Sequence, residues 1–145
     1  MRTTYYLTLI LSFTLLFASC KKDEDAAENT PPTPTEQEYT VDLYVKYTGN
    51  YSGAIVKYND QNGVEQQETL DLSQTEWKKT IVVKKDFKVF VRGELNLEPG
   101  PQHTYEAGAS VHKKDGGFVS SGSQPQSKTG LQIAISQSTE YTKTL

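Results

Sequence analysis

From Val41 onward the chain repeats one simple pattern, in which apolar residues alternate with polar ones. The alternation is clearest over residues 41–47, 54–58, 87–91 and 105–111. A period of two places every second side chain on the same face of a β-strand, whereas an amphipathic helix needs a period of 3.6. The sequence therefore predicts an all-β domain whose strands each bury one face.

Turn sequences divide this domain, residues 39–145, into seven or eight short strands. The expected strands lie near 41–47, 54–58, 64–72, 77–83, 87–91, 105–111, 118–119 and 131–135. Asn62-Gly63 is typical of a tight hairpin, and hairpins are expected to make most connections. The Gly/Ser/Gln/Pro-rich segment 120–130 is expected to be a loop. Strands of this number and length predict an antiparallel β-sandwich, with a partly closed barrel as the alternative.

The expected core comes from the same alternation. Phe87, Val89 and Val91 share one face of their strand, and we expect them to be buried together with Ile81 and Val83. Trp77, which opens the strand before them, is expected to be at least partly buried. By contrast, Glu65-Gln66-Gln67-Glu68 predicts a solvent-exposed edge strand.

The only cysteine, Cys20, ends a leader that has one cation, Arg2, an apolar run over residues 5–17 and the small pair Ala18-Ser19. This order is typical of a secretory signal peptide, and small residues before a cysteine resemble the lipobox of bacterial lipoproteins. The run is shorter than the roughly 20 residues of a membrane-spanning helix. We therefore expect residues 1–19 to be cleaved and Cys20 to be lipidated; an ordinary cleaved signal peptide is the alternative.

Residues 20–38 are predicted to be the lipidated cysteine and a flexible tether, because they contain several prolines and almost no apolar side chains. Fully extended, the 18 residues after the cysteine would reach about 55 Å. The tether begins with a short charged run that resembles the export signal of some Gram-negative surface lipoproteins: Lys21, Lys22, Asp23, Glu24 and Asp25. We expect a lipid-anchored protein of the outer membrane with its domain at the cell surface; a domain facing the periplasm is the alternative.

Charge and cysteine content limit the partners. Without its leader the chain has 14 basic residues (15 less Arg2) and 18 acidic ones, a balance of −4. Nucleic acid is not an expected partner, because binding to phosphates needs clustered Lys and Arg. No second cysteine is available for a disulfide, so the single domain, expected to be a monomer, must be held by its core.

No residue pattern indicates catalysis or a cofactor. His103 and His112 are expected to face solvent, and a zinc site would need further ligands that the sequence does not cluster. Residues 59–63 lack the spacing of a calcium loop and are expected to form a plain hairpin turn. The carboxylate pairs lie in the linker or on the polar strand, away from an apolar pocket: Glu36/Glu38 and Glu65/Glu68.

Two surface features are candidates for binding. Lysine pairs near predicted turns would form a basic rim if two of them lay at one end of the sandwich: Lys78-Lys79, Lys84-Lys85 and Lys113-Lys114. Aromatic residues would form a stacking platform for sugar rings: Tyr44, Tyr51, Tyr58, Trp77 and Tyr105. Tyr51, Lys84 and Lys85 are the candidate binding surface. The simpler explanations are that lysines protect strand ends and that tyrosines pack on strand faces.

Several short segments resemble a known group of proteins: Tyr47-Thr48-Gly49, Ile55-Val56-Lys57-Tyr58, Asn62-Gly63 and Trp77-Lys78-Lys79-Thr80. They are similar to the small immunoglobulin-like sandwiches of bacterial lipoproteins and, more distantly, to the MmpS family of transporter-associated membrane proteins. The resemblance covers roughly residues 41–91, and Glu76 stands where relatives often have proline. It implies an immunoglobulin-like sandwich and brings no catalytic residues. A transporter partner is not implied, because that family is anchored by a helix.

Together these features predict a non-catalytic binding or accessory module of the envelope, with a glycan or an envelope protein as its partner. A structural envelope lipoprotein without a ligand is the second hypothesis, and a hydrolase is the third. The fold alone does not choose among them, because function depends on a site that the fold only supports.

Overall fold

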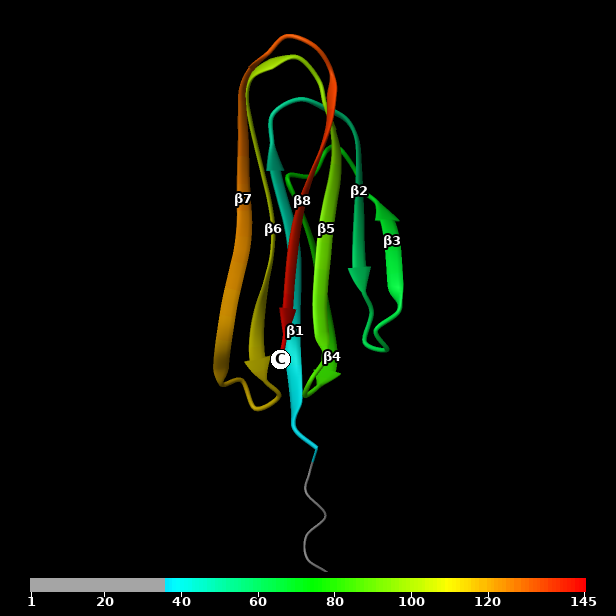
Figure 1. The fold of residues 1–145 in the computed structure, drawn as a ribbon, viewed down its shortest axis with the longest axis vertical. Helices are drawn as coiled ribbons and strands as arrows, with labels where there is room; N and C mark the ends of the chain where they lie inside the picture. Colours follow the sequence, from blue (N-terminus) through cyan, green and yellow to red (C-terminus); the bar gives the residue numbers. More distant parts are fainter. Residues whose placement is uncertain (1–35) are drawn as a thin grey trace, which may run out of the picture. The chain divides into compact units, whose positions relative to one another are not determined.

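The computed structural model describes residues 36–145, which form eight strands in two four-stranded antiparallel sheets (Figure 1). The strands are β1 (Glu38–Thr48), β2 (Tyr51–Asn59), β3 (Glu65–Thr69), β4 (Glu76–Lys84), β5 (Lys88–Leu97), β6 (Gly100–Lys113), β7 (Phe118–Leu131) and β8 (Ile135–Thr144). The predicted all-β sandwich is confirmed. The leader, Cys20 and the tether up to residue 35 lie outside the described residues. Among those described, no helix is long and apolar enough to cross a membrane.

The two sheets alternate along the chain. Sheet A has the strand order β4-β1-β6-β7, and sheet B has the order β3-β2-β5-β8. Only β2–β3 and β6–β7 are hairpins within one sheet; the other connections cross from one sheet to the other. The expectation that hairpins dominate is therefore wrong, because strands adjacent in sequence mostly face each other across the core instead of pairing.

The core follows the two-residue alternation. Val41, Leu43 and Val45 of β1 are fully buried, as are Val89 and Val91 of β5. Further inward-facing residues join them in one cluster: Val56, Trp77, Ile81, Val83, Leu95, Tyr105, Ala107, Ala109 and Val111. Phe87 lies just before β5 and is only partly buried. The predicted core residues Ile81, Val83, Val89 and Val91 are confirmed, because alternation along each strand fixes which side chains face the opposite sheet, whereas Phe87 only packs against this core.

The C-terminal region differs most from expectation. Residues 120–130, predicted as a loop, belong to the long strand β7, which is the outer strand of sheet A. An edge strand tolerates Pro125 and small polar side chains, since it pairs on one side only and buries little side-chain surface. The predicted last strand at 131–135 is also wrong: Leu131 ends β7, Ile133 lies in the connection with 71% of its surface exposed, and Ile135 begins β8.

Strand direction defines two ends of the sandwich. The entry end contains Glu36, Leu145 and the β2–β3, β4–β5 and β6–β7 turns, because β1 enters there and Glu38 pairs with Lys84. The distal end contains the β1–β2, β3–β4, β5–β6 and β7–β8 connections (Figure 1). The first described residues, Glu36 onward, therefore lie at the entry end.

The core predicts a sharp difference between two valine substitutions. Val89→Asp places an unpaired charge in a core without disulfides, which costs several kcal/mol against a total stability of about 5–15 kcal/mol. We expect chemical denaturation to show partial or complete unfolding of this variant. Val82→Asp is the matched control, because Val82 is 46% exposed on the outer face of β4, and we expect near wild-type stability. Equal effects of the two substitutions would contradict the assignment of faces.

Candidate functional site

A groove of about 660 Å³ lies on the outer face of sheet A, in the half nearer the distal end. Its side chains come from strands that are far apart in sequence but paired in register. Lys46 of β1 lies between Glu76 of β4 and Glu106 of β6, and Pro125 of β7 lies beside Glu106. The next row towards the distal end contains Thr48, Thr104 and Ser127. We refer to this surface as the sheet A groove.

Charges in and beside the sheet A groove are balanced. Lys46 Nζ lies 3.7 Å from Glu76 Oε1, and Lys78 Nζ lies 2.8 Å from Glu76 Oε2. Glu106 adds the second carboxylate. Thr48 Oγ1 and Thr104 Oγ1 lie 2.6 Å apart in a hydrogen bond. The surface thus combines carboxylate acceptors, ammonium donors and hydroxyl groups without a net charge.

Tyr44 borders this surface from β1. Its hydroxyl donates to Glu106 Oε1 at 3.1 Å, and Lys46 Nζ lies 4.8 Å from the centre of its ring. The phenol end lies against the sheet at Gly108, where a Cβ atom would come within 2.6 Å of Tyr44 Cζ. A side chain at Gly108 would therefore displace the ring. Partial burial raises the pKa of Tyr44, which keeps the hydroxyl protonated as a donor at neutral pH.

Tyr51 supports the groove from behind. It begins β2 in sheet B, and its hydroxyl donates to the backbone oxygen of Thr104 at 2.9 Å and also contacts the backbone oxygen of Thr48. Burial raises the pKa of Tyr51 to about 12. Tyr51 is therefore a positioning residue that holds two strands of the groove, and its partly buried ring packs on Tyr47 and His103.

Most of the predicted aromatic platform is likewise internal. Tyr58, Trp77 and Tyr105 belong to the core, with 4%, 9% and 2% of their surface exposed. Tyr58 and Trp77 pack on each other with ring centres 5.2 Å apart. The alternation explains the error, because these rings occupy inward positions of β2, β4 and β6. Tyr44 alone among the five predicted residues lies on an outer face beside a groove.

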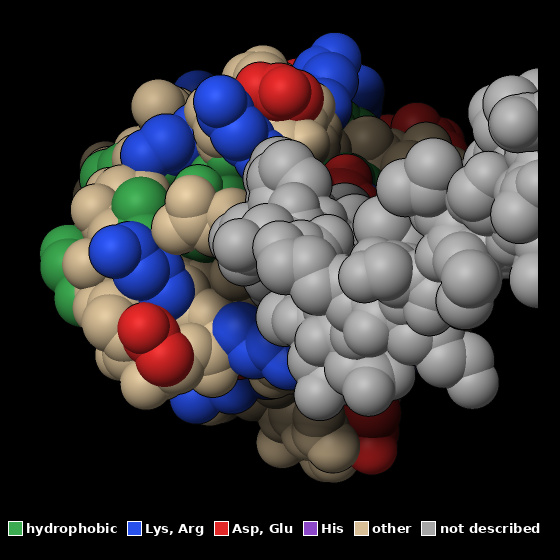
Figure 2. All heavy atoms as spheres, turned by 90° about the horizontal axis from the view of Figure 1, so that it is seen from below, with side chains coloured by type: hydrophobic (Ala, Val, Ile, Leu, Met, Phe, Trp, Pro, Cys, Tyr) green, Lys and Arg blue, Asp and Glu red, His purple; other side chains and the backbone are tan. Residues whose placement is uncertain are grey.

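Lys84 and Lys85 lie at the opposite end of the sandwich from Tyr51, so the three predicted binding residues do not form one surface. The Lys84-Lys85 and Lys113-Lys114 pairs do share the entry end, since Glu38 pairs with Lys84 and Tyr39 with Lys113. However, Lys84 forms an ion pair with Glu36, and Lys114 forms one with Glu38. Figure 2, which views this end, shows lysines and acids interspersed. The rim is therefore of mixed charge.

The two histidines differ from each other. His112 lies on the outer face of sheet A, with Nε2 3.9 Å from Asp42 Oδ2. His103 is fully buried near the distal end, against Tyr51, and neither ring nitrogen has a hydrogen-bond partner within residues 36–145. The prediction that His103 faces solvent is wrong, because it occupies an inward position two residues before Tyr105. No group of three or more metal-ligating side chains occurs among the described residues.

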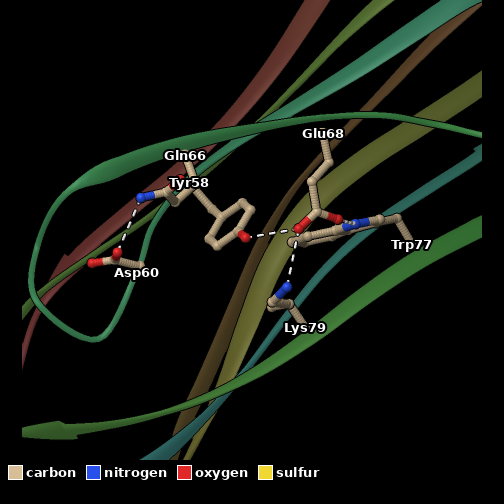
Figure 3. Close-up of polar contacts among 6 residues, drawn as sticks. All are labelled: Tyr58, Asp60, Gln66, Glu68, Trp77 and Lys79. Atoms are coloured by element: carbon tan, nitrogen blue, oxygen red, sulfur yellow. Dashed lines mark hydrogen bonds and ion pairs between the residues drawn. The ribbon is translucent and has the colours of Figure 1, made fainter.

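Glu68 of β3 is the centre of a polar cluster that joins the outer strands of the two sheets (Figure 3). Its carboxylate accepts hydrogen bonds from Trp77 Nε1 at 2.8 Å, Tyr58 OH at 2.7 Å and Lys79 Nζ at 3.0 Å. These contacts, chiefly that from Trp77, hold the pKa of Glu68 below its usual range. Glu68 is therefore not the freely solvated carboxylate that the polar strand predicted.

The same contacts indicate a structural role for Glu68, because every donor comes from the sandwich itself. The turn beside it is organised in the same way: Asp60 Oδ1 accepts from the backbone N–H groups of Asn62 and Val64, and Gly63 adopts a positive φ of 77°. The predicted hairpin turn at 59–63 is confirmed.

The lowered pKa of Glu68 predicts how stability changes with pH. A carboxyl group with a depressed pKa in the folded state stabilises the protein above its unfolded value, near 4.5, and loses this contribution as the pH falls through the folded value. Glu68→Gln should destabilise the domain by about 1–2 kcal/mol at neutral pH and flatten the stability profile below pH 4.5. Trp77, the only tryptophan, reports this by fluorescence during denaturation. An unchanged profile in Glu68→Gln would contradict the assigned role.

Sequence reasoning missed the residues of the sheet A groove. Lys46, Glu76 and Glu106 are ordinary outward residues of three strands, and only the order β4-β1-β6 brings them together. The alternation around 41–47 and 105–111 already assigns Lys46 and Glu106 to outer faces. The missing information was strand pairing, which local sequence does not contain.

Comparisons of the chain with protein-family models, with curated proteins and with solved structures found no match. The geometry of the domain is therefore the main basis for a functional proposal.

Proposed function

We propose that this protein is a lipid-anchored, non-catalytic binding module of the bacterial outer membrane, with its domain at the cell surface, and that it recognises a neutral saccharide. The observation that carries the proposal is the sheet A groove, in which paired strands place carboxylates, ammonium groups and hydroxyls beside an outward-facing tyrosine. The immunoglobulin-like character of the sandwich belongs to the same proposal.

The charge balance of the groove favours a neutral polar ligand. Lys46 and Lys78 are matched by Glu76 and Glu106, so neither an anion nor a cation gains a large electrostatic advantage. An acyl chain or an apolar small molecule would need a pocket lined mainly by apolar side chains. Besides Pro125, the inward-facing Tyr47 and Tyr105 also line the groove, but its other lining side chains are polar or charged.

A saccharide satisfies this arrangement because its hydroxyls both donate and accept. Glu106 Oε1 already accepts from Tyr44, and no hydrogen bond or ion pair within residues 36–145 uses Glu106 Oε2. A ligand hydroxyl donating to a carboxylate forms a stronger bond than one between neutral groups. The ring of Tyr44 and the ring of Pro125 offer apolar surfaces for the C–H face of a sugar.

The sheet A groove predicts which substitutions weaken saccharide binding. We expect calorimetric titration of a panel of neutral hexasaccharides (cellohexaose, mannohexaose, maltohexaose and chitohexaose) to identify a ligand, and Glu106→Ala and Tyr44→Ala to weaken it about tenfold or more. Glu65→Ala is the matched control, since Glu65 is an exposed carboxylate on β3, outside the groove.

Two results would contradict this proposal. Binding that survives both Glu106→Ala and Tyr44→Ala would place the ligand elsewhere. Absence of binding to every member of the panel and to a wider glycan array would favour the structural envelope hypothesis.

The anchor makes a separate prediction. Cys20→Ser removes the only thiol that can be acylated, so this variant should lose fatty-acid labelling and leave the membrane fraction. Protease added to intact cells should degrade the wild-type domain if it lies at the cell surface. Identical labelling and fractionation of wild type and Cys20→Ser would contradict the lipid anchor.

A further inference from the structure

The outer face of sheet B carries a second groove, of about 680 Å³. Outward positions of all four strands line it, among them Gly53 of β2, Thr69 of β3, Glu94 and Asn96 of β5, and Ser136 of β8. We refer to this surface as the sheet B groove. It has nearly the volume of the sheet A groove and, like it, lies in the half of the sandwich nearer the distal end.

A missing side chain opens the sheet B groove. Gly53 occupies an outward position on a central strand, where other residues would project a side chain over the sheet. The backbone of Gly53 has no positive φ, so another residue could adopt it. A Cβ atom at this position would lie 3.1 Å from Nδ2 of Asn96, at the end of a flexible side chain. The pairing of β2 with β5 also shifts register between Tyr51 and Gly53. The hollow thus results from Gly53 and the register shift beside it in β2.

The polar groups around this hollow are arranged as in the sheet A groove. Ser136 Oγ donates to Asn96 Oδ1 at 2.9 Å, which fixes the amide with Nδ2 towards Gly53. Glu94 Oε1 lies 3.0 Å from Lys57 Nζ and 3.2 Å from Arg92 Nε. Arg92 also approaches Glu140 at 3.9 Å, so two cations again face two carboxylates.

Two accessible donors of this surface point to a ligand. Asn96 Nδ2 and the hydroxyl of Thr69 belong to exposed residues that line the groove, and no hydrogen bond within residues 36–145 uses either group. Arg92 Nε, by contrast, is buried 3.2 Å from Glu94 Oε1, where a ligand does not reach it. With these two donors and balanced charges around them, the surface suits a neutral, hydroxyl-rich ligand.

We propose that the domain carries two saccharide sites, one on each outer face, and can therefore hold two separate glycan segments at once. This inference rests on the proposed function of the sheet A groove. The grooves face away from each other because they lie on the outer faces of packed layers (Figure 1). A short oligosaccharide cannot span both, since packed sheets are about 10 Å apart and the ligand would have to pass around an edge strand. Longer polymers would be cross-linked.

Calorimetric titration of the detergent-solubilised, lipidated protein tests this proposal with the same neutral hexasaccharides. Wild type should bind two molecules. Gly53→Gln, whose side chain fills the sheet B groove, should bind one molecule. Glu106→Ala should lose at least tenfold in affinity at the sheet A groove. Asn96→Ala provides a second sheet B variant with little effect on folding, because Asn96 is exposed. Fluorescence of the buried Trp77 verifies that each variant is folded.

The possible failures differ from one another. If wild type binds one molecule, and Gly53→Gln and Asn96→Ala bind it equally well, the second site is overturned. The assignment of the sheet A groove then stands. A single site abolished by Gly53→Gln overturns both the sheet A assignment and bivalency. No binding by wild type overturns the proposed function and this inference with it.

Discussion

The contact between two apolar sheet faces is the interaction on which the rest of this structure depends. Among residues 36–145 no disulfide is available, since the only cysteine is Cys20. The domain is instead held by inward-facing residues such as Val41, Leu43, Val89 and Val91, all fully buried. At about 25 cal/mol per Å² of buried apolar surface, such a core is the main source of stability. Because alternate residues of each strand face inward, the residues between them are free to form the outer faces.

This division explains why both candidate grooves lie on outer faces. The inner faces fix the registers of the strands, and the registers in turn place Lys46 between Glu76 and Glu106 in sheet A and Glu94 beside Ser138 in sheet B. The core and the grooves also touch directly. Tyr51 crosses from sheet B to bond the backbone of Thr104 in sheet A. The outer surface is thus positioned by rigid strands instead of by mobile loops.

The sequence allowed the fold class and the inner faces to be predicted because alternation is a local property. Val89 and Val91 could be assigned to the core without knowledge of any partner strand. Residues 120–130 were predicted as a loop because Pro125 and several serines are typical of loops. An edge strand also tolerates these residues, because one of its sides pairs with no neighbouring strand. His103 was also misjudged, since its polarity outweighed its inward position.

The candidate site could be predicted only in part. Tyr44 was singled out as a sugar-stacking residue, and it lies beside the sheet A groove. Glu106 and Asn96 could not be recognised, because their partners Tyr44 and Ser136 are far away in sequence and are brought close by strand pairing. Lys84 and Lys85 illustrate the converse: the pair stands out in the sequence, but Lys84 forms an ion pair with Glu36 in the folded domain.

Chemical-shift mapping tests the central claim, that the outer sheet faces bind saccharide, most directly. A ¹⁵N-labelled protein would be titrated with the neutral hexasaccharide that it binds most tightly. The account predicts that the largest shifts of backbone amides occur at Lys46, Thr48 and Glu106 of sheet A, with a second set at Gly53 and Asn96 of sheet B. Shifts confined to the entry end, around Lys84 and Lys113, would contradict it.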